Sequence, residues 1–289
     1  MLAPCVSLSA RAFQEVLRDW IGKTLWKKSL FPIYLLLLYV LPALVYKNFN
    51  AALTVKLFIW YFGMAIFFSV HAPAGKEVSW RDGAVTLLLW LPIEFSQFSG
   101  FDIVVNDFIT IPALPFAAVA FGIYLFVVLR NLPDIGYTFM WKLKDLATAL
   151  TALLILAVIL VPLGTSIGFI HPSAVHVSVA ELAKLLFGIY FMVALPEELL
   201  FRGIIQNLLQ KWVPGRASFP VSLIIASVIF GVSHYNNFNP PDWRYVYLAT
   251  IAGIFYGFTY WKTGKTTVSA LVHCGVNTVW ATVFPGTAG

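Results

Sequence analysis

Apolar runs long enough for membrane-spanning helices recur along most of this chain, and short polar stretches separate them. Nine runs are present, at residues 30–46, 53–71, 84–98, 108–129, 146–170, 181–209, 218–233, 246–261 and 266–283. About 20 consecutive apolar residues suffice for an α-helix to cross the hydrocarbon core of a bilayer. The pattern therefore predicts an all-α fold, a polytopic transmembrane helical bundle of about eight or nine spans.

Two of these runs are unusual. The run 84–98 is short and contains Pro92 and Glu94, so it either spans the membrane or lies in its interface. The run 181–209 is long for one span and contains Pro196. Proline lacks an amide hydrogen, and its ring clashes with the preceding helical turn. We therefore expect a kink or a break of the helix at Pro196.

Composition and charge agree with a membrane protein. Only 11% of the residues are charged and 60% are hydrophobic, whereas a soluble domain has about 25% charged residues. With a cytoplasmic N-terminus, fourteen of the nineteen Lys and Arg residues fall on the inner side and two on the outer side. This asymmetry follows the positive-inside rule. We expect an integral membrane protein with a cytoplasmic N-terminus.

The same features indicate location and partners. Compact loops without targeting signals favour the bacterial inner (plasma) membrane. The net charge of +6 comes from basic residues between apolar runs, and these residues do not form a basic stripe with interleaved aromatics for nucleic-acid binding. We therefore expect the lipid bilayer, and no nucleic acid, as a partner.

The polar segment 129–145 is the expected boundary between two halves of the chain. The apolar runs before this segment contain few ionisable residues, and the runs after it contain most of them. We predict an N-terminal membrane module of unassigned role at residues 1–129 and a second domain at residues 130–289. The second domain carries the candidate chemistry.

Three charged residues lie inside an apolar run of the second half. In the stretch ALPEELLFRGII they are Glu197, Glu198 and Arg202. An ionisable residue at mid-membrane costs roughly 2.5–3.5 kcal/mol, so it is kept where it pairs, loses its charge or takes part in chemistry. Glu198 and Arg202 are four residues apart, which favours an ion pair on one helix face. Glu197 lies about 100° away around the helix and lacks that partner.

Two later runs carry polar residues at the same spacing. Phe230 and His234 are four residues apart, and so are His273 and Asn277. Polar groups at this depth must face one another or a wet cavity. Each pair alone is also typical of structural residues, such as a packed histidine or an interhelical asparagine. Together with Glu197, they are the parts of a water-activating site: a base, a second base or ligand, and oxyanion donors.

These three patterns resemble the motifs of a known family. PEELLFRG resembles its E-E-x-x-x-R motif, FGVSH its F-x-x-x-H motif and HCGVN its H-x-x-x-N motif. The family is that of the type II CAAX prenyl proteases and bacteriocin-processing enzymes, the CPBP or Abi-type intramembrane proteases. The resemblance covers roughly residues 130–283. It implies a CAAX-protease-like (Abi) intramembrane protease domain at residues 130–289 and leaves residues 1–129 outside.

The resemblance also implies roles for the polar residues. Glu197 would be the general base that polarises the attacking water, and His234 would help to hold that water. His273 and Asn277 would stabilise the tetrahedral oxyanion, as preorganised donors in a dry site do for roughly 3–4 kcal/mol.

Glu198 and Arg202 would hold the helix and tune the neighbouring base. In an alternative interpretation, Glu197, His234 and His273 form a His₂Glu site for a divalent metal such as zinc, with water in the fourth position. The chain has no H-E-x-x-H motif and so lacks the usual ligand pair of two histidines four residues apart. The preferred interpretation is therefore a glutamate-dependent protease that requires no cofactor.

The resulting hypothesis is an intramembrane endopeptidase that hydrolyses a peptide bond of a membrane-associated or lipid-anchored substrate with a Glu/His-activated water. Its partners would be a membrane peptide or protein substrate and the lipid bilayer. The alternative is a non-catalytic membrane protein, such as a transporter or an immunity partner, whose buried Glu and His side chains form a polar path. A polar path accounts less well for the shared helix face of His273 and Asn277.

Overall fold

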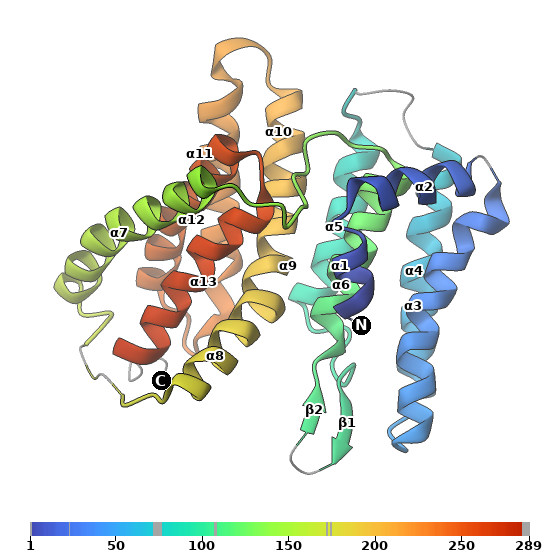
Figure 1. Ribbon diagram of the computed structural model, residues 1–289, viewed down its shortest axis with the longest axis horizontal. Helices are drawn as coiled ribbons and strands as arrows, with labels where there is room; N and C mark the ends of the chain where they lie inside the picture. Colours follow the sequence, from blue (N-terminus) through green and yellow to red (C-terminus); the bar gives the residue numbers. More distant parts are fainter. Residues whose placement is uncertain are drawn as a thin grey trace. The chain divides into compact units, whose positions relative to one another are not determined.

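The structure is a computed structural model of an almost entirely helical chain (Figure 1). It describes residues 2–22, 24–71, 77–106, 109–171, 173 and 175–284. The chain divides into two compact units, Met1–Pro133 and Asp134–Gly289. Helices make up most of each unit, and the all-α fold that the hydrophobic pattern predicts is confirmed.

The first unit is built mainly of helices. Its elements are α1 (Leu2–Ser7), α2 (Arg11–Ile21), α3 (Leu25–Val45), α4 (Ala51–His71), α5 (Trp80–Glu94), β1 (Ile103–Asn106), β2 (Ile109–Ile111), α6 (Ala113–Ile123) and the π-helical segment η1 (Tyr124–Leu129). Helices α3 and α4 pack together, and α4 also contacts α5 and η1. A buried ion pair joins Asp82 of α5 to Arg130, with 2.7 Å between Oδ1 and Nε.

One part of the first unit differs from the predicted helical run 108–129. Residues Ile103–Asn106 and Ile109–Ile111 pair as an antiparallel hairpin, and helix α6 begins only at Ala113. The sequence Ile-Thr-Ile is β-branched throughout and Pro112 follows it, so the local preference is for an extended strand that ends before the helix. Because the strand and the helix are both apolar, hydrophobicity alone predicts them as one run.

The second unit contains the three motifs. Its elements are α7 (Leu143–Ser166), α8 (Val179–Gly188), η2 (Ile189–Ala194), α9 (Leu195–Glu198), η3 (Leu199–Gln206), α10 (Asn207–Trp212), η4 (Gly215–Ala217), α11 (Ser218–Ser233), η5 (Tyr235–Asn237), α12 (Trp243–Thr263) and α13 (Thr266–Val283). Helices α11 and α12 pack against each other, and α12 and α13 both pack on α7. Helix α13, drawn in red in Figure 1, also packs against η2 and α9.

The long run with Pro196 forms one continuous helix. Elements α8 to α10 follow one another without interruption over 179–212, so of the kink or break that we expected at Pro196 the break does not occur. The winding changes instead, because the π-helical segments η2 and η3 flank the short α-helical piece α9. A π-helical turn bonds to the fifth residue along and is wider than an α-helical turn. The proline therefore lies between two wide turns, and the chain stays helical.

Five helices among the described residues are long and apolar enough to cross a membrane. They are Leu25–Val45, Ala51–Ser69, Leu143–Ser166, Val179–Trp212 and Gly215–Asn237. An integral membrane protein follows from these spans. The number of eight or nine spans stays a prediction.

An extended segment at the start of the second unit is bound to the turn between α12 and α13. The amide of Thr266 donates to the carbonyl of Gly136 over 3.1 Å, and the Trp141 indole Nε1 donates to Thr267 Oγ1 over 2.9 Å. Gly136 has a φ of +70°, and a Cβ at this position would lie 2.2 Å from the carbonyl oxygen of Gly264. Only glycine fits this close approach. The segment therefore fixes the end of the bundle at which α13 begins.

Candidate active site

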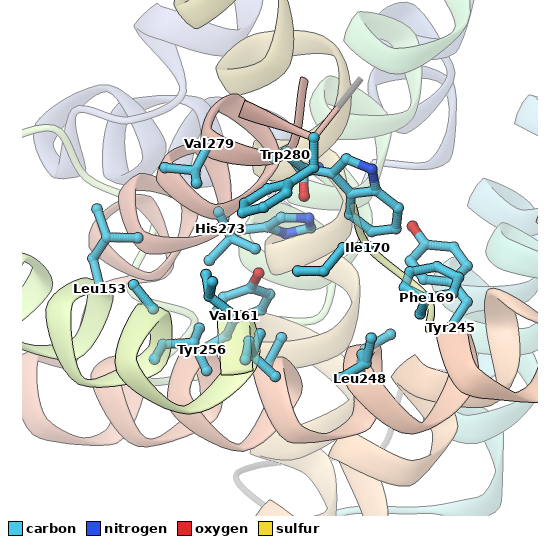
Figure 2. A pocket seen from close by; sticks show the side chains of 18 of the residues that line it. Leu153, Val161, Phe169, Ile170, Tyr245, Leu248, Tyr256, His273, Val279 and Trp280 are labelled. Carbon is cyan, nitrogen blue, oxygen red and sulfur yellow. The ribbon is translucent and has the colours of Figure 1, made fainter. Parts of the chain in front are cut away.

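A cavity of about 230 Å³ lies inside the second unit, between α7, α12 and α13. Figure 2 shows Leu153 and Val161 of α7, His273 and Trp280 of α13 and Tyr256 of α12 around this space. Most of the wall is apolar. His234, His273 and Asn277 give it a polar part, so two of the three motifs contribute polar side chains to one cavity.

Glu197 belongs to the short α-helical piece between the two π-helical segments. Its Oε2 atom lies 3.9 Å from Nε2 of His234 and 3.9 Å from Nε2 of His273. This oxygen is buried and has no hydrogen-bond partner among the described residues. A buried carboxylate oxygen without a partner is costly. The two imidazoles and this oxygen thus surround a point that a small polar molecule can occupy.

His234 is held at the end of α11 by the backbone of its own motif. Its Nδ1 lies 2.8 Å from the carbonyl oxygen of Phe230, and because a carbonyl only accepts, Nδ1 carries the proton. The helix ends here, and the amide of His234 bonds to Gly231 rather than to Phe230, which leaves the Phe230 carbonyl free for side chains. In the neutral ring, Nε2 therefore has no hydrogen, and its lone pair faces Glu197.

His273 is oriented by Glu198, the second glutamate of the first motif. Nδ1 of His273 lies 3.0 Å from Oε1 of Glu198. The imidazole also stacks on the ring of Tyr256, with centroids 4.7 Å apart and planes 14° apart. A carboxylate on Nδ1 fixes both the tautomer and the direction of the ring. Nε2 of His273 consequently points toward Glu197.

Phe230 contacts both histidines of this centre, and also Tyr256 and Arg202. Its ring centroid lies 4.6 Å from that of His234, 5.6 Å from that of His273 and 5.8 Å from that of Tyr256. The guanidinium carbon of Arg202 lies over the same ring, 4.5 Å from its centroid. The phenylalanine of the F-x-x-x-H motif is thus a wall that these side chains share.

Glu198 and Arg202 form the ion pair that their spacing predicts, and both side chains are fully buried. The contact between Glu198 Oε2 and Arg202 Nε is 3.3 Å long. The structure adds a third partner, since the Ser269 hydroxyl lies 2.6 Å from the same Oε2. Glu198 contacts His273 rather than Glu197. The ion pair of Glu198 and Arg202 therefore affects the base, Glu197, only through the histidine.

Glycines on α12 bring the arginine close to that helix. Arg202 Nη2 donates to the carbonyl of Gly253 over 3.0 Å, and one turn later Gln206 Nε2 donates to the carbonyl of Gly257 over 3.1 Å. A Cβ at Gly257 would lie 2.4 Å from Gln206 Oε1. Two glycines four residues apart are a sequence signal for close helix packing in membranes. The spacing of Gly253 and Gly257 is therefore a signal in the sequence for the partners of Arg202, which the three motifs do not contain.

Asn277 lies one turn after His273 on α13 and lines the same cavity. Cys274, which follows His273 in the motif, does not line this cavity, and its Sγ lies 3.5 Å from the Leu186 carbonyl oxygen. The structure thus brings Glu197, His234 and His273 together, puts Asn277 beside them, and places the Glu198–Arg202 pair behind His273.

When both histidine rings are neutral, the groups around the central point include more hydrogen-bond acceptors than one water molecule can donate to. With both Nδ1 atoms protonated, Glu197 Oε2, His234 Nε2 and His273 Nε2 all present lone pairs. A water molecule donates only two hydrogen bonds. One of the three groups must therefore carry a proton if a single water is to bond to all of them.

The spacing of these atoms is too wide for a zinc site. Zinc bonds of about 2.1 Å would span 3.9 Å only at an angle of about 135°, far from the tetrahedral 109°. Two hydrogen bonds of about 2.8 Å span the same distance at about 90°. Among the described residues, no group of three or more His, Cys, Asp or Glu side chains is arranged to hold a metal ion. The residues as placed suit a water molecule better than a metal.

Comparison with known proteins bears on the same residues. Residues 179–279 match the family model described as type II CAAX prenyl endopeptidase Rce1-like. No curated protein and no solved structure matches the chain. The matched range contains all three motifs, from Glu197 to Asn277. This region of the second unit is therefore similar to the type II CAAX prenyl endopeptidase family, the resemblance that the three motifs predict.

Proposed function

We propose that the protein is an intramembrane endopeptidase that hydrolyses a peptide bond of a membrane-associated or lipid-anchored substrate. The observation that supports this proposal is the convergence of Glu197 Oε2 with Nε2 of His234 and of His273 at 3.9 Å each. These atoms lie beside an apolar cavity in a unit with membrane-spanning helices. The family match names an endopeptidase for this region.

In the proposed resting site, a water molecule donates one hydrogen bond to Glu197 Oε2 and one to His234 Nε2. His273 then carries protons on both ring nitrogens, and its Nε2 donates to the oxygen of the water. The carboxylate of Glu198 on Nδ1 compensates the positive charge of this ring. This assignment satisfies all three groups with one water and needs no metal.

The reaction follows from these positions. Glu197 takes a proton as the water oxygen attacks the scissile carbonyl carbon, and the C–O bond forms while the carbonyl becomes an oxyanion. His273 Nε2–H and the Asn277 side-chain amide donate to that oxyanion. Glu197 then passes its proton to the leaving nitrogen as the C–N bond breaks. Loss of one oxyanion donor typically lowers kcat by roughly 10² to 10³.

The surroundings suit a lipophilic substrate. The cavity beside the histidines is lined mainly by leucine, valine, alanine and aromatic side chains, so it favours an apolar part of a substrate over a charged one. Exclusion of water from such a site strengthens the hydrogen bonds to the oxyanion. The charge asymmetry of the loops supports a cytoplasmic N-terminus, and the compact loops support a location in the bacterial inner membrane.

The deciding experiment is cleavage of a membrane-tethered peptide by the purified protein in lipid. Glu197→Gln keeps the size of the side chain and removes the base, so turnover should fall to background. Glu94→Gln makes the same change on α5 of the first unit and should leave turnover unchanged. Wild-type turnover in Glu197→Gln would refute the proposal. If the wild type cleaves nothing yet carries protons across a vesicle membrane in a Glu197-dependent way, the chain is a transporter.

A further inference from the structure

Ser269 lies one turn before His273 on α13, in none of the three motifs, and is fully buried. We infer that it is a positioning residue for the reaction, because it keeps the Glu198 carboxylate directed at His273. The importance of Ser269 for turnover rests on the proposed function. The structural content of the inference, the hydrogen bonding of His273, can be measured without any substrate.

The Ser269 hydroxyl has one proton and two acceptors within reach. Its Oγ lies 2.6 Å from Glu198 Oε2 and 2.8 Å from the carbonyl oxygen of Tyr256. The Tyr256 carbonyl lies inside α12, where it also accepts from the amide four residues later. The carboxylate is charged and gives the stronger bond. The proton of Ser269 therefore belongs to Glu198.

Arg202 competes for the same carboxylate. Its Nε lies 3.3 Å from Glu198 Oε2, but neither Nε nor Nη1 has a hydrogen-bond partner among the described residues, and both are buried. A guanidinium binds both oxygens of a carboxylate through Nε and Nη2, whose hydrogens point the same way, and Nη2 has a second hydrogen besides the one that it donates to Gly253. Such a bidentate pair would use Oε1, the atom that now holds His273 Nδ1 at 3.0 Å.

Ser269 opposes this rotation because it holds Oε2 on the side of α13. Since Oε2 stays on Ser269, Oε1 remains on His273, one turn further along the same helix. Without the serine, the carboxylate can turn to Arg202, and His273 keeps only its ring contacts with Tyr256 and Phe230. Stacking holds the plane of the ring but does not decide which nitrogen carries a proton. Ser269 thus sets how Glu198 is divided between the arginine and the histidine.

The test uses the full-length protein in lipid with two substitutions. Ser269→Ala removes the hydroxyl, and Ser269→Cys keeps nearly the same volume but offers only a weak donor. Both should lower kcat by about 10- to 100-fold, the effect of losing a hydrogen bond to a charged group, with a smaller change in KM. Ser227→Ala is the matched control, since Ser227 is a buried serine of α11 whose hydroxyl has no hydrogen-bond partner among the described residues.

The second readout is the ¹⁵N NMR spectrum of histidine-labelled protein, in which the His273 signals are assigned by their loss in His273→Gln. The Nδ1 signal should shift in both Ser269 variants and stay in place in Ser227→Ala. If Ser269→Cys keeps wild-type turnover, or the His273 signals do not move, the inference is wrong. If the wild type has no turnover at all, the proposed function fails, and the NMR comparison still decides whether Ser269 holds Glu198 on His273.

Discussion

Replacing Glu198 by glutamine removes a negative charge from the interior of the second unit and changes the volume of the side chain little. Its partner Arg202 is also fully buried, donates one hydrogen bond to Gly253 over 3.0 Å, and has no hydrogen-bond partner at Nε or Nη1 among the described residues. The substitution therefore leaves a buried cation without its counter-charge. Removing one member of a buried pair costs about 3–5 kcal/mol. We expect the free energy of unfolding to fall by that amount.

The chain contains a matched control for this substitution. Arg11 and Glu15 form another pair four residues apart, on α2, with side chains that are 90% and 51% exposed. Exposed pairs contribute about 0–1 kcal/mol, so Glu15→Gln should lower the free energy of unfolding by less than 1 kcal/mol. Reversible unfolding of the purified protein in mixed detergent micelles, followed by tryptophan fluorescence, measures both variants on one scale.

A double substitution distinguishes two causes of lost stability: a buried arginine without a counter-charge, and the loss of a single contact. Glu198→Gln with Arg202→Met removes both charges and fills the space of the arginine with an apolar side chain, so much of the lost stability should return. The reasoning is refuted if Glu198→Gln is as stable as Glu15→Gln. It is equally refuted if the double variant loses the sum of the two single losses.

Three further results are expected. Glu197→Ala and His234→Ala should each abolish turnover, and the double variant should be no worse than either, because both residues act on one water; additive losses would contradict this. Turnover should survive a strong chelator, since the 3.9 Å spacing suits water, and restoration by zinc after a loss would overturn the metal-free mechanism. A single cysteine at Asn236, in a chain without its two native cysteines, should react with an impermeant thiol reagent in intact cells; reaction only after permeabilisation would put the site on the cytoplasmic side.

A pH effect is expected at the loop beside the site. The Arg244 side chain donates to Asp242 and holds the pKa of that carboxyl below its usual range. The bond therefore stabilises the fold above the pKa of the unfolded chain, and this contribution disappears as the pH falls through the lowered pKa. Asp242→Asn should flatten the acid side of a plot of unfolding temperature against pH. An unchanged slope in that variant would contradict the assignment.

The hydrophobic pattern was sufficient to locate most helices, because lipid-facing and core-facing residues are both apolar over the length of a span. It failed where local preference decides, as in the hairpin that ends at Ile111, whose apolar strand reads as part of the next helix. At Pro196 the chemistry of proline predicted a kink or a break; the helix is not broken there, and its winding changes instead.

Spacing within one helix predicted the pair of Glu198 with Arg202, because side chains four residues apart lie on one face. It could not show that Glu198 also bonds to His273, since that contact joins residues 75 positions apart. The sequence did not predict a role for Ser269 for the same reason. Its hydroxyl matters only because α13 packs on α9, and nothing in its local sequence distinguishes it from a packing serine.

The ring of Phe230 has a consequence for how such sites vary. The arginine lies over its face at 4.5 Å and the rings of both histidines pack against it, so one side chain sets the distances between groups on three helices. A leucine would preserve the apolar character and most of the volume, but it lacks the negative face that attracts a cation and the flat edge that an imidazole packs against. Exchange at this position should therefore alter the arginine and both histidines together. In distant relatives, a change at this aromatic residue should occur together with changes at the charged ones.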